Sequence, residues 1–165
     1  MQSLKNIVIN GLMIIGLSFG LMMSSVASND FYWYKTQAEQ GNVSSQTMIG
    51  IMYLNGEGVS KDLQQSFIWF EKAAKQGDSV AQTNIGMMYD LGQGVRQDKK
   101  KAKEWFQKSA DQNEPLAQLM LGDYYQSGTT VRQDRKKAKE WFGKSCDEGL
   151  QEGCDFYRKL NERGY

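Results

Sequence analysis

Residues 95–109 read VRQDKKKAKEWFQKS, and the same stretch recurs at residues 131–145 as VRQDRKKAKEWFGKS. The two copies lie 36 residues apart and are identical at 13 of 15 positions. Self-similarity at a fixed period of this length is the sequence signature of a repeat protein, in which one unit cannot bury its apolar face alone and stacks on its neighbours. This stretch therefore predicts a repeat architecture.

Outside this stretch, single positions recur at the same spacing, and they reveal a third, more divergent copy. The recurring positions are Gly50, Gly86 and Gly122; Tyr53, Tyr89 and Tyr125; Gly56, Gly92 and Gly128; Val59, Val95 and Val131; Asp62, Asp98 and Asp134; and Trp69, Trp105 and Trp141. They divide the chain into three repeats, at residues 42–77, 78–113 and 114–149.

Each repeat is predicted to contain two helices, which we call A and B. In the second repeat, apolar residues follow helical spacing up to Tyr89 and again after Asp98. Between them, Gly92 and Gly94 can adopt the positive φ angles that end a helix and reverse the chain. Asp98 stands where an N-cap acceptor is needed, as does the aspartate at this position in the other repeats.

The ends of the B helices and one loop give further predictions. Gly77, Asn113 and Gly149 follow the three B helices and can take the left-handed conformation of a helix stop. In the third repeat, Thr130 replaces the second loop glycine. Because a β-branched residue tolerates positive φ poorly, this loop is predicted to differ in shape from the other two.

Both flanks keep the register of the repeats. Residues 28–41 contain an orphan B helix at Asn29 to Gln40, which would cap the N-terminal end. Residues 150–165 contain a capping A helix at Leu150 to Leu160, in which Arg158 occupies the position of the repeat glycine. That glycine is useful where another helix must approach closely, so Arg158 is typical of a terminal cap.

The first 27 residues are predicted to be a signal peptide. Lys5 precedes a long apolar run from Ile7 to Met23, and Ser25 and Ala27 fit the small-x-small cleavage pattern. The alternative is a retained membrane anchor, because the run comes close to spanning a bilayer. Beyond residue 27 no second run of such length follows, so no membrane insertion is expected after cleavage.

The charge balance and the cysteine content limit the classes of binding partner and the cellular compartments that are expected. Removing Lys5 from 20 basic and 19 acidic residues leaves 19 of each, and this neutrality argues against nucleic-acid binding. In an exported chain, Cys146 and Cys154 are predicted to form a disulfide; the alternative is two buried thiols. The expected location is periplasmic or secreted.

These residues resemble a known family. The pattern Ala81-x-x-x-Ile85-Gly86-x-x-Tyr89-x-x-Gly92-x-Gly94-Val95-x-x-Asp98-x-x-Lys101-Ala102-x-x-Trp105-x-x-Lys108 is similar to the Sel-1-like repeat. The resemblance implies an all-α fold, namely an α-solenoid related to tetratricopeptide repeats that forms a right-handed superhelix. It also implies that the A helices line the concave face, and that the protein acts as an adaptor for other proteins.

The spacing from Cys146 to Cys154 is similar to that of the cysteine-rich secreted branch of this family, where the bond joins a B helix to the next A helix. Some members of this branch are linked to penicillin binding and β-lactam hydrolysis, which gives an enzymatic alternative. The sequence contains no histidine, and no serine after residue 27 has a lysine three residues later. A non-enzymatic module without a cofactor or a metal is therefore predicted.

Other motifs have a structural and a functional interpretation. The Trp-Phe pairs at 69–70, 105–106 and 141–142 and the repeat tyrosines are predicted to fill the core rather than a ligand box. The loop glycines are predicted to be turn residues, since no strand precedes them as a phosphate cradle requires. The basic clusters at 99–103 and 135–139 are assigned to a solvated convex face, with an acidic partner as the alternative.

The candidate binding surface is the face of the A helices that would line the groove. It consists of the residues three before and one, four and five after each repeat glycine. These are Thr47, Ile51, Leu54 and Asn55 in the first repeat, Thr83, Met87, Asp90 and Leu91 in the second, and Leu119, Asp123, Gln126 and Ser127 in the third. The mixture of Met, Leu and Ile with short polar side chains suits a peptide or a partner helix. The alternative is that several of these residues only pack the superhelix.

Overall fold

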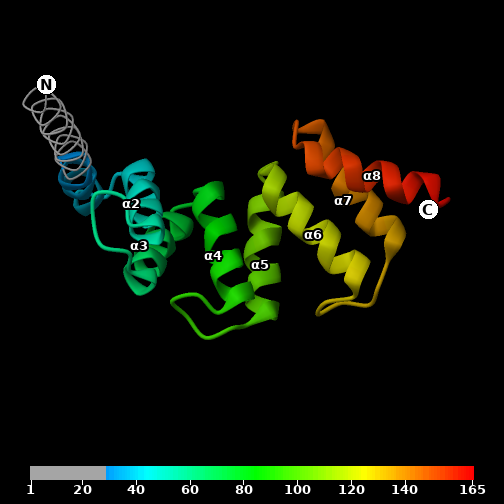
Figure 1. Ribbon diagram of the computed structural model, residues 1–165, viewed down its shortest axis with the longest axis horizontal. Coiled ribbons are helices and arrows are strands. Elements are labelled where there is room, and N and C mark those ends of the chain that lie inside the picture. Colours follow the sequence, from blue (N-terminus) through cyan, green and yellow to red (C-terminus); the bar gives the residue numbers. More distant parts are fainter. Residues whose placement is uncertain (1–28) are drawn as a thin grey trace, which may run out of the picture.

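The computed structural model describes residues 29–165, so the predicted signal peptide lies outside the described residues. Every regular element within residues 29–165 is a helix. The helices follow one another in chain order along the longest dimension of the molecule (Figure 1). This arrangement confirms the predicted all-α solenoid.

The described chain begins in a helical segment at residues 29–39, the predicted N-terminal cap. Three helix pairs and a last helix follow: α2 (Val43–Asn55) with α3 (Leu63–Lys75), α4 (Ser79–Leu91) with α5 (Lys99–Ala110), α6 (Pro115–Ser127) with α7 (Arg135–Asp147), and α8 (Gln151–Glu162). Each helix packs against the next one in sequence, and in addition α2 contacts α4 and α6 contacts α8. No contact of similar extent joins two B helices, or joins α4 to α6, among the described residues.

The predicted caps of the B helices are present. The Asp62 carboxylate accepts hydrogen bonds from the main-chain N–H groups of Gln64 and Gln65, both at 3.0 Å. Asp98 caps α5 in the same way, and Asp134 caps α7 by accepting from the main-chain N–H of Lys137. An N-cap of this kind stabilises a helix by about 1 kcal/mol, because it satisfies N–H groups that have no partner within the helix.

The prediction for Thr130 is wrong, because its loop keeps the shape of the other two. Thr130 has φ 60°, close to the 67° of Gly58 and the 68° of Gly94. The hydrogen bonds around it are those of the second repeat: Gln133 Nε2 donates to the main-chain oxygen of Gln126 at 2.7 Å, as Gln97 does to that of Asp90. These bonds hold the backbone in place, so Thr130 accepts a conformation that costs it on the order of 1 kcal/mol.

Within each repeat, the two helices touch at a glycine. A Cβ atom built on Gly50 would lie 2.6 Å from the ring of Phe70, and one on Gly86 would lie 2.5 Å from Phe106. Gly122 and Phe142 make the third such contact. All three phenylalanines are at most 1% exposed. Trp69 and Trp141 are also buried and Trp105 is half-buried, so the Trp-Phe pairs belong to the core, as predicted.

A buried glutamine in each A helix links consecutive repeats. The side-chain amides of Gln46, Gln82 and Gln118 each donate to a main-chain oxygen of the preceding B helix, at 3.1, 3.2 and 3.5 Å. In the first two repeats the side-chain oxygen also accepts from a second glutamine (Gln76 to Gln46 at 2.7 Å, Gln112 to Gln82 at 2.8 Å). Glu148 occupies the corresponding position in the third repeat, and Gln118 Oε1 is left buried without a partner among the described residues.

Replacing Glu148 with Gln should restore the missing donor. We expect Glu148→Gln to stabilise the protein by about 1 kcal/mol, because a buried acceptor gains a hydrogen bond. The reciprocal change, Gln112→Glu, should remove the donor from Gln82 and destabilise by a similar amount. Unfolding in urea at neutral pH measures both free energies; equal stability of all three proteins would disprove the role of this ladder.

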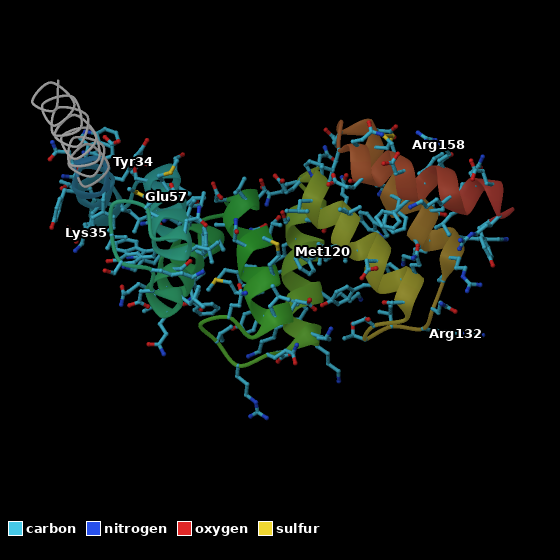
Figure 2. The ribbon with its side chains drawn as sticks, viewed as in Figure 1. Tyr34, Lys35, Glu57, Met120, Arg132 and Arg158 are labelled. Carbon is cyan, nitrogen blue, oxygen red and sulfur yellow. A yellow bond between two sulfur atoms is a disulfide. The ribbon has the colours of Figure 1, made fainter. Side chains whose placement is uncertain are left out.

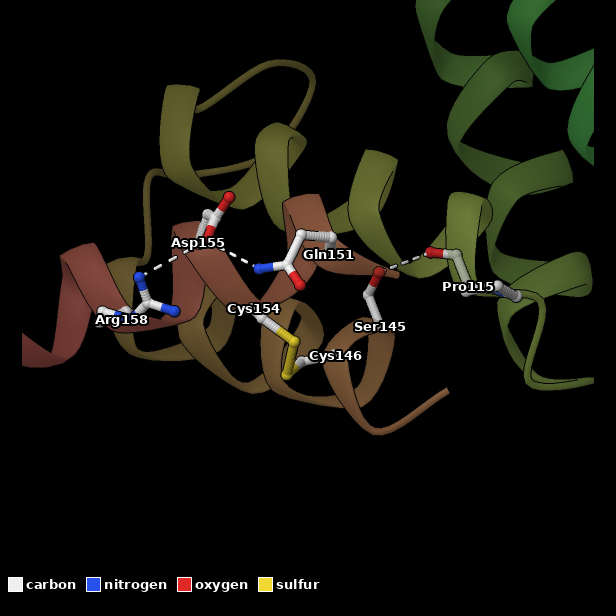
Figure 3. The surroundings of a disulfide bond; sticks show 7 residues. All are labelled: Pro115, Ser145, Cys146, Gln151, Cys154, Asp155 and Arg158. Carbon is white, nitrogen blue, oxygen red and sulfur yellow. Dashed lines mark hydrogen bonds and ion pairs between the residues drawn. A yellow bond between two sulfur atoms is a disulfide. The ribbon is translucent and has the colours of Figure 1, made fainter. Parts of the chain in front are cut away.

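The disulfide predicted from the sequence is present and joins the C-terminal cap to the third repeat. Cys146 in α7 is bonded to Cys154 in α8, eight residues further on (Figure 3). On the same turn of α7, Ser145 Oγ donates to the main-chain oxygen of Pro115 in α6 at 2.8 Å. The end of α7 is thus tied covalently to the following helix and by a hydrogen bond to the preceding one.

Breaking this bond should loosen the cap. We expect Cys146→Ser to cost roughly 2 kcal/mol, since the short closed loop restricts the unfolded chain, and to lower the melting temperature by several degrees. Thermal unfolding followed by circular dichroism measures the change, with wild type in reductant as the control that should match the variant. If wild type and variant melt together without reductant, the bond does not stabilise the fold.

Candidate partner-binding surface

The residues predicted to line the concave face differ in how far they reach solvent. Four of the twelve are exposed: Asn55, Leu91, Asp123 and Ser127. Asn55, Leu91 and Ser127 are the last residues of α2, α4 and α6, so they occupy equivalent places in the three repeats. Leu91 is 60% exposed.

Four apolar members are half-buried and lie against core clusters that span adjacent repeats or the C-terminal cap. Ile51 and Leu54 border a cluster that contains Phe70 of the first repeat and Ile85 of the second. Met87 borders the cluster shared by the second and third repeats, and Leu119 borders the cluster that the third repeat shares with α8. These side chains therefore contribute to the stacking of the repeats as well as to the groove.

Two predicted members do not reach the surface. Thr47 and Thr83 are 8% and 2% exposed. Thr83 Oγ1 is 2.8 Å from Ser109 Oγ and also donates to the main-chain oxygen of Ser79 at 3.1 Å, so it connects α4 to α5 within one repeat. Thr47 and Thr83 therefore do not belong to the accessible part of the candidate surface.

Asp90 is held by its neighbours. The Tyr124 hydroxyl donates to Asp90 Oδ1 at 2.5 Å, and Lys99 Nζ lies 3.5 Å from the same oxygen. Tyr124 is 2% exposed and stands where the first two repeats have methionine. Burial raises the pKa of Tyr124 well above its ordinary value, and the hydrogen bond and charge of Asp90 and the charge of Asp123 add to this shift. The bond from Tyr124 to Asp90 thus links the third repeat to the second. Gln126, which is equivalent to Asp90 in the third repeat, is also half-buried.

A second kind of surface lies at the loops that join A helices to B helices. A hollow of about 360 Å³ in the second repeat is bordered by Tyr89, Arg96 and Lys101, together with Val95, Gln97 and Asp98. A hollow of about 580 Å³ in the third repeat is bordered by the equivalent residues, Tyr125, Arg132 and Lys137 among them. Arg132 lies on the loop between α6 and α7 (Figure 2).

The repeat tyrosines Tyr89 and Tyr125 pack against core clusters, as predicted. Both are half-buried, and each also borders a loop hollow. The signal that could have located the hollows is present in the sequence. Arg96 and Arg132 recur at the repeat spacing, but Ser60 occupies their position in the first repeat.

The described residues provide little material for other kinds of site. Within residues 29–165, no group of three or more His, Cys, Asp or Glu side chains is arranged to hold a metal ion. None of the helices in this part of the chain has both the length and the apolar character to cross a membrane.

Helix pairs of constant length that contact only their neighbours along the array define an α-solenoid repeat protein. The Sel1 repeat family model matches residues 43–78, 79–114 and 115–150, so the chain belongs to the Sel1 repeat family. Members of this family are generally protein-interaction modules and non-enzymatic scaffolds. No curated protein matches the chain.

Solved structures show the same fold. A protective antigen of uropathogenic Escherichia coli with an SLR fold is 38% identical, with a TM-score of 0.77 over 80% of this chain, but the match spans only 28% of that antigen. A Sel1 repeat protein from Oxalobacter formigenes is 35% identical, with a TM-score of 0.71 over 79% of this chain and 98% of that one. Cysteine-rich protein B of Helicobacter pylori, at 21% identity and a TM-score of 0.63 over 80% of this chain and 95% of that one, is similar in fold.

The Tyr124–Asp90 bond leads to a prediction about alkaline stability. We expect Tyr124→Phe to cost about 1.5 kcal/mol at pH 8, because a hydrogen bond to a charged group is lost. The folded state keeps Tyr124 protonated above pH 10, whereas the unfolded chain releases the proton. The advantage of wild type should therefore shrink by up to about 1.4 kcal/mol per pH unit above pH 10. Denaturant titrations of both proteins at pH 8, 10 and 11 measure the difference in unfolding free energy between wild type and Tyr124→Phe. A difference that does not change with pH would contradict the assignment.

Proposed function

We propose that this chain is an exported interaction module that binds a peptide or a partner protein on the concave face of its A helices. The observation that carries the proposal is Leu91, an exposed leucine at the end of α4 and on the face that the A helices share. An apolar side chain exposed to this degree gains free energy when a partner covers it, at about 25 cal/mol per Å² of buried apolar surface.

The surroundings of Leu91 suit a short segment of another protein. Met87 lies one turn before it on α4, half-buried and flexible, and can adapt its side chain to an apolar anchor of the partner. Asn55 and Ser127 provide polar groups at the equivalent places of the neighbouring repeats. Apolar anchors flanked by hydrogen-bonding groups are what a groove for a peptide or a helix requires.

Export is supported by the disulfide. A bond between Cys146 and Cys154 persists in oxidising compartments and is rare in the cytosol, where thiols are kept reduced. Together with the apolar segment in residues 1–27, this supports a periplasmic or secreted protein. No observation on the described residues favours the β-lactam-hydrolysing alternative, and we propose no catalytic activity.

Site-specific photo-crosslinking tests the proposal in the producing cells. A photoreactive phenylalanine analogue at position 91 should give a defined protein adduct, whereas the same analogue at Glu104, an exposed position on the B helix α5, should not. A separate variant, Leu91→Glu without the analogue, tests the same surface. The protein found in the adduct should no longer co-purify with this variant, while the helical circular dichroism signal stays unchanged. Identical adducts from positions 91 and 104 would refute a concave binding face.

A further inference from the structure

The two loop hollows have the same chemistry and lie one repeat apart. Each combines a tyrosine ring, an arginine from the loop and a lysine from the first turn of the B helix: Tyr89, Arg96 and Lys101 in one, and Tyr125, Arg132 and Lys137 in the other. The lysine ammonium lies over the tyrosine ring in both, at 5.3 Å and 4.5 Å from the ring centre. The first repeat has Ser60 and Gln65 in place of the arginine and the lysine.

The positive charges of the hollows are not needed for folding. The first repeat forms the same pair of helices without them. Lysines in the first turn of a helix are slightly unfavourable, because they meet the positive end of the helix dipole. Within residues 29–165, none of Arg96, Lys101, Arg132 and Lys137 forms a salt bridge. These four charges are therefore available to a ligand.

A contact within the chain indicates which ligand groups this edge accepts. Tyr165 borders the hollow of the third repeat. Arg135 Nη1 donates to the Tyr165 hydroxyl at 2.8 Å, and Lys139 Nζ donates to its main-chain oxygen at 2.5 Å. Arg135, which also borders this hollow, thus donates to an oxygen of a polypeptide segment within the chain itself. The equivalent hollow in the second repeat has no such occupant among the described residues.

The class of ligand follows from the rest of the lining. The 19 acidic and 19 basic residues that follow the predicted signal peptide give no long-range attraction for a densely charged polymer such as nucleic acid. Each hollow also contains the capping aspartate, Asp98 or Asp134, which repels closely spaced phosphates. A polypeptide fits better, because its carboxylates can meet the arginine and lysine while its N–H groups face the aspartate.

The spacing of the hollows sets the spacing of the carboxylates. Helix α5 packs against both α4 and α6, and axes of packed helices lie 8–10 Å apart, so two such steps put the hollows roughly 10–20 Å apart. An extended chain covers this distance in about three to six residues. We propose that the loop hollows of the second and third repeats form a paired site for an acidic, extended polypeptide segment with carboxylates about three to six residues apart. This surface lies outside the twelve concave-face residues, so it goes beyond the function proposed above.

Fluorescence anisotropy on the purified, oxidised protein without its signal peptide tests the inference. The probe is a fluorescein-labelled twelve-residue peptide with Glu at every third position and Ser, Thr or Gly between; its control has Gln at the same positions. We expect the Glu peptide to bind at least tenfold more tightly than the Gln peptide, and its affinity to fall as salt is raised from 50 to 200 mM. Equal binding of the two peptides would overturn the proposal.

The matched variants use residues that the first repeat already carries. Lys101→Gln with Lys137→Gln copies Gln65 and should weaken binding of the Glu peptide about tenfold, while the single changes should each weaken it less. Lys35→Gln with Lys75→Gln removes the same charge from positions outside the hollows, in the N-terminal cap and the first repeat. Each of these lysines forms an ion pair only with a glutamate four residues away, so the change should leave binding unchanged.

Two outcomes would overturn the assignment. One is an equal loss of affinity in the Lys35/Lys75 variant, which would mean that only total charge matters. The other is tighter binding of a single-stranded oligonucleotide than of the Glu peptide, lost in the Lys101/Lys137 variant, which would make the hollows a nucleic-acid surface. Because the assay uses a defined peptide, its result is independent of whether Leu91 contacts a cellular partner.

Discussion

The close contact between a glycine of each A helix and a phenylalanine of each B helix sets the geometry of the whole array. Gly86 carries no Cβ atom that would keep the ring of Phe106 away, so the two helices approach as closely as their backbones permit. The buried ring then fills the space between them. Because the same contact occurs in all three repeats, each pair presents nearly the same surface to the next, and a regular stack results.

On this regular frame, the repeats differ in the polar contacts at their junctions. The first two carry complete glutamine pairs, whereas in the third the side-chain oxygen of Gln118 has no partner among residues 29–165, and Glu148 replaces the second glutamine. The third instead gains the hydroxyl of Tyr124, which reaches Asp90 across the junction. Buried polar groups favour one arrangement of their neighbours, because any other leaves them unpaired. The junctions are thus individually distinct although the units look alike.

The 36-residue period predicted most of the fold, because positions such as Asp98 and Gly92 act locally, through a cap or a backbone angle. Thr130 was mispredicted because the hydrogen bonds of its loop outweigh the preference of a single residue. The concave face was harder to predict. Periodicity places Thr83 and Leu91 on one helix but does not tell which of them the second helix of the repeat covers. In the structure Thr83 is the covered residue, buried against Ser109 of α5. The recurrence of Arg96 and Arg132 is visible in the sequence, but only the folded loop brings these arginines to a tyrosine ring, so the hollows were not predicted.

Arg158 stands in α8 where the other A helices have their glycine, and its guanidinium lies in solvent 3.6 Å from Asp155 (Figure 3). A long charged side chain at this point keeps any further B-type helix at a distance at which an aromatic ring could not fill the gap. The N-terminal end offers such a helix, with Tyr32 and Trp33 exposed on residues 29–39. The series of close glycine–phenylalanine contacts therefore stops at α8, and the two ends of the array present different surfaces, a charged one at Arg158 and an aromatic one at Tyr32 and Trp33.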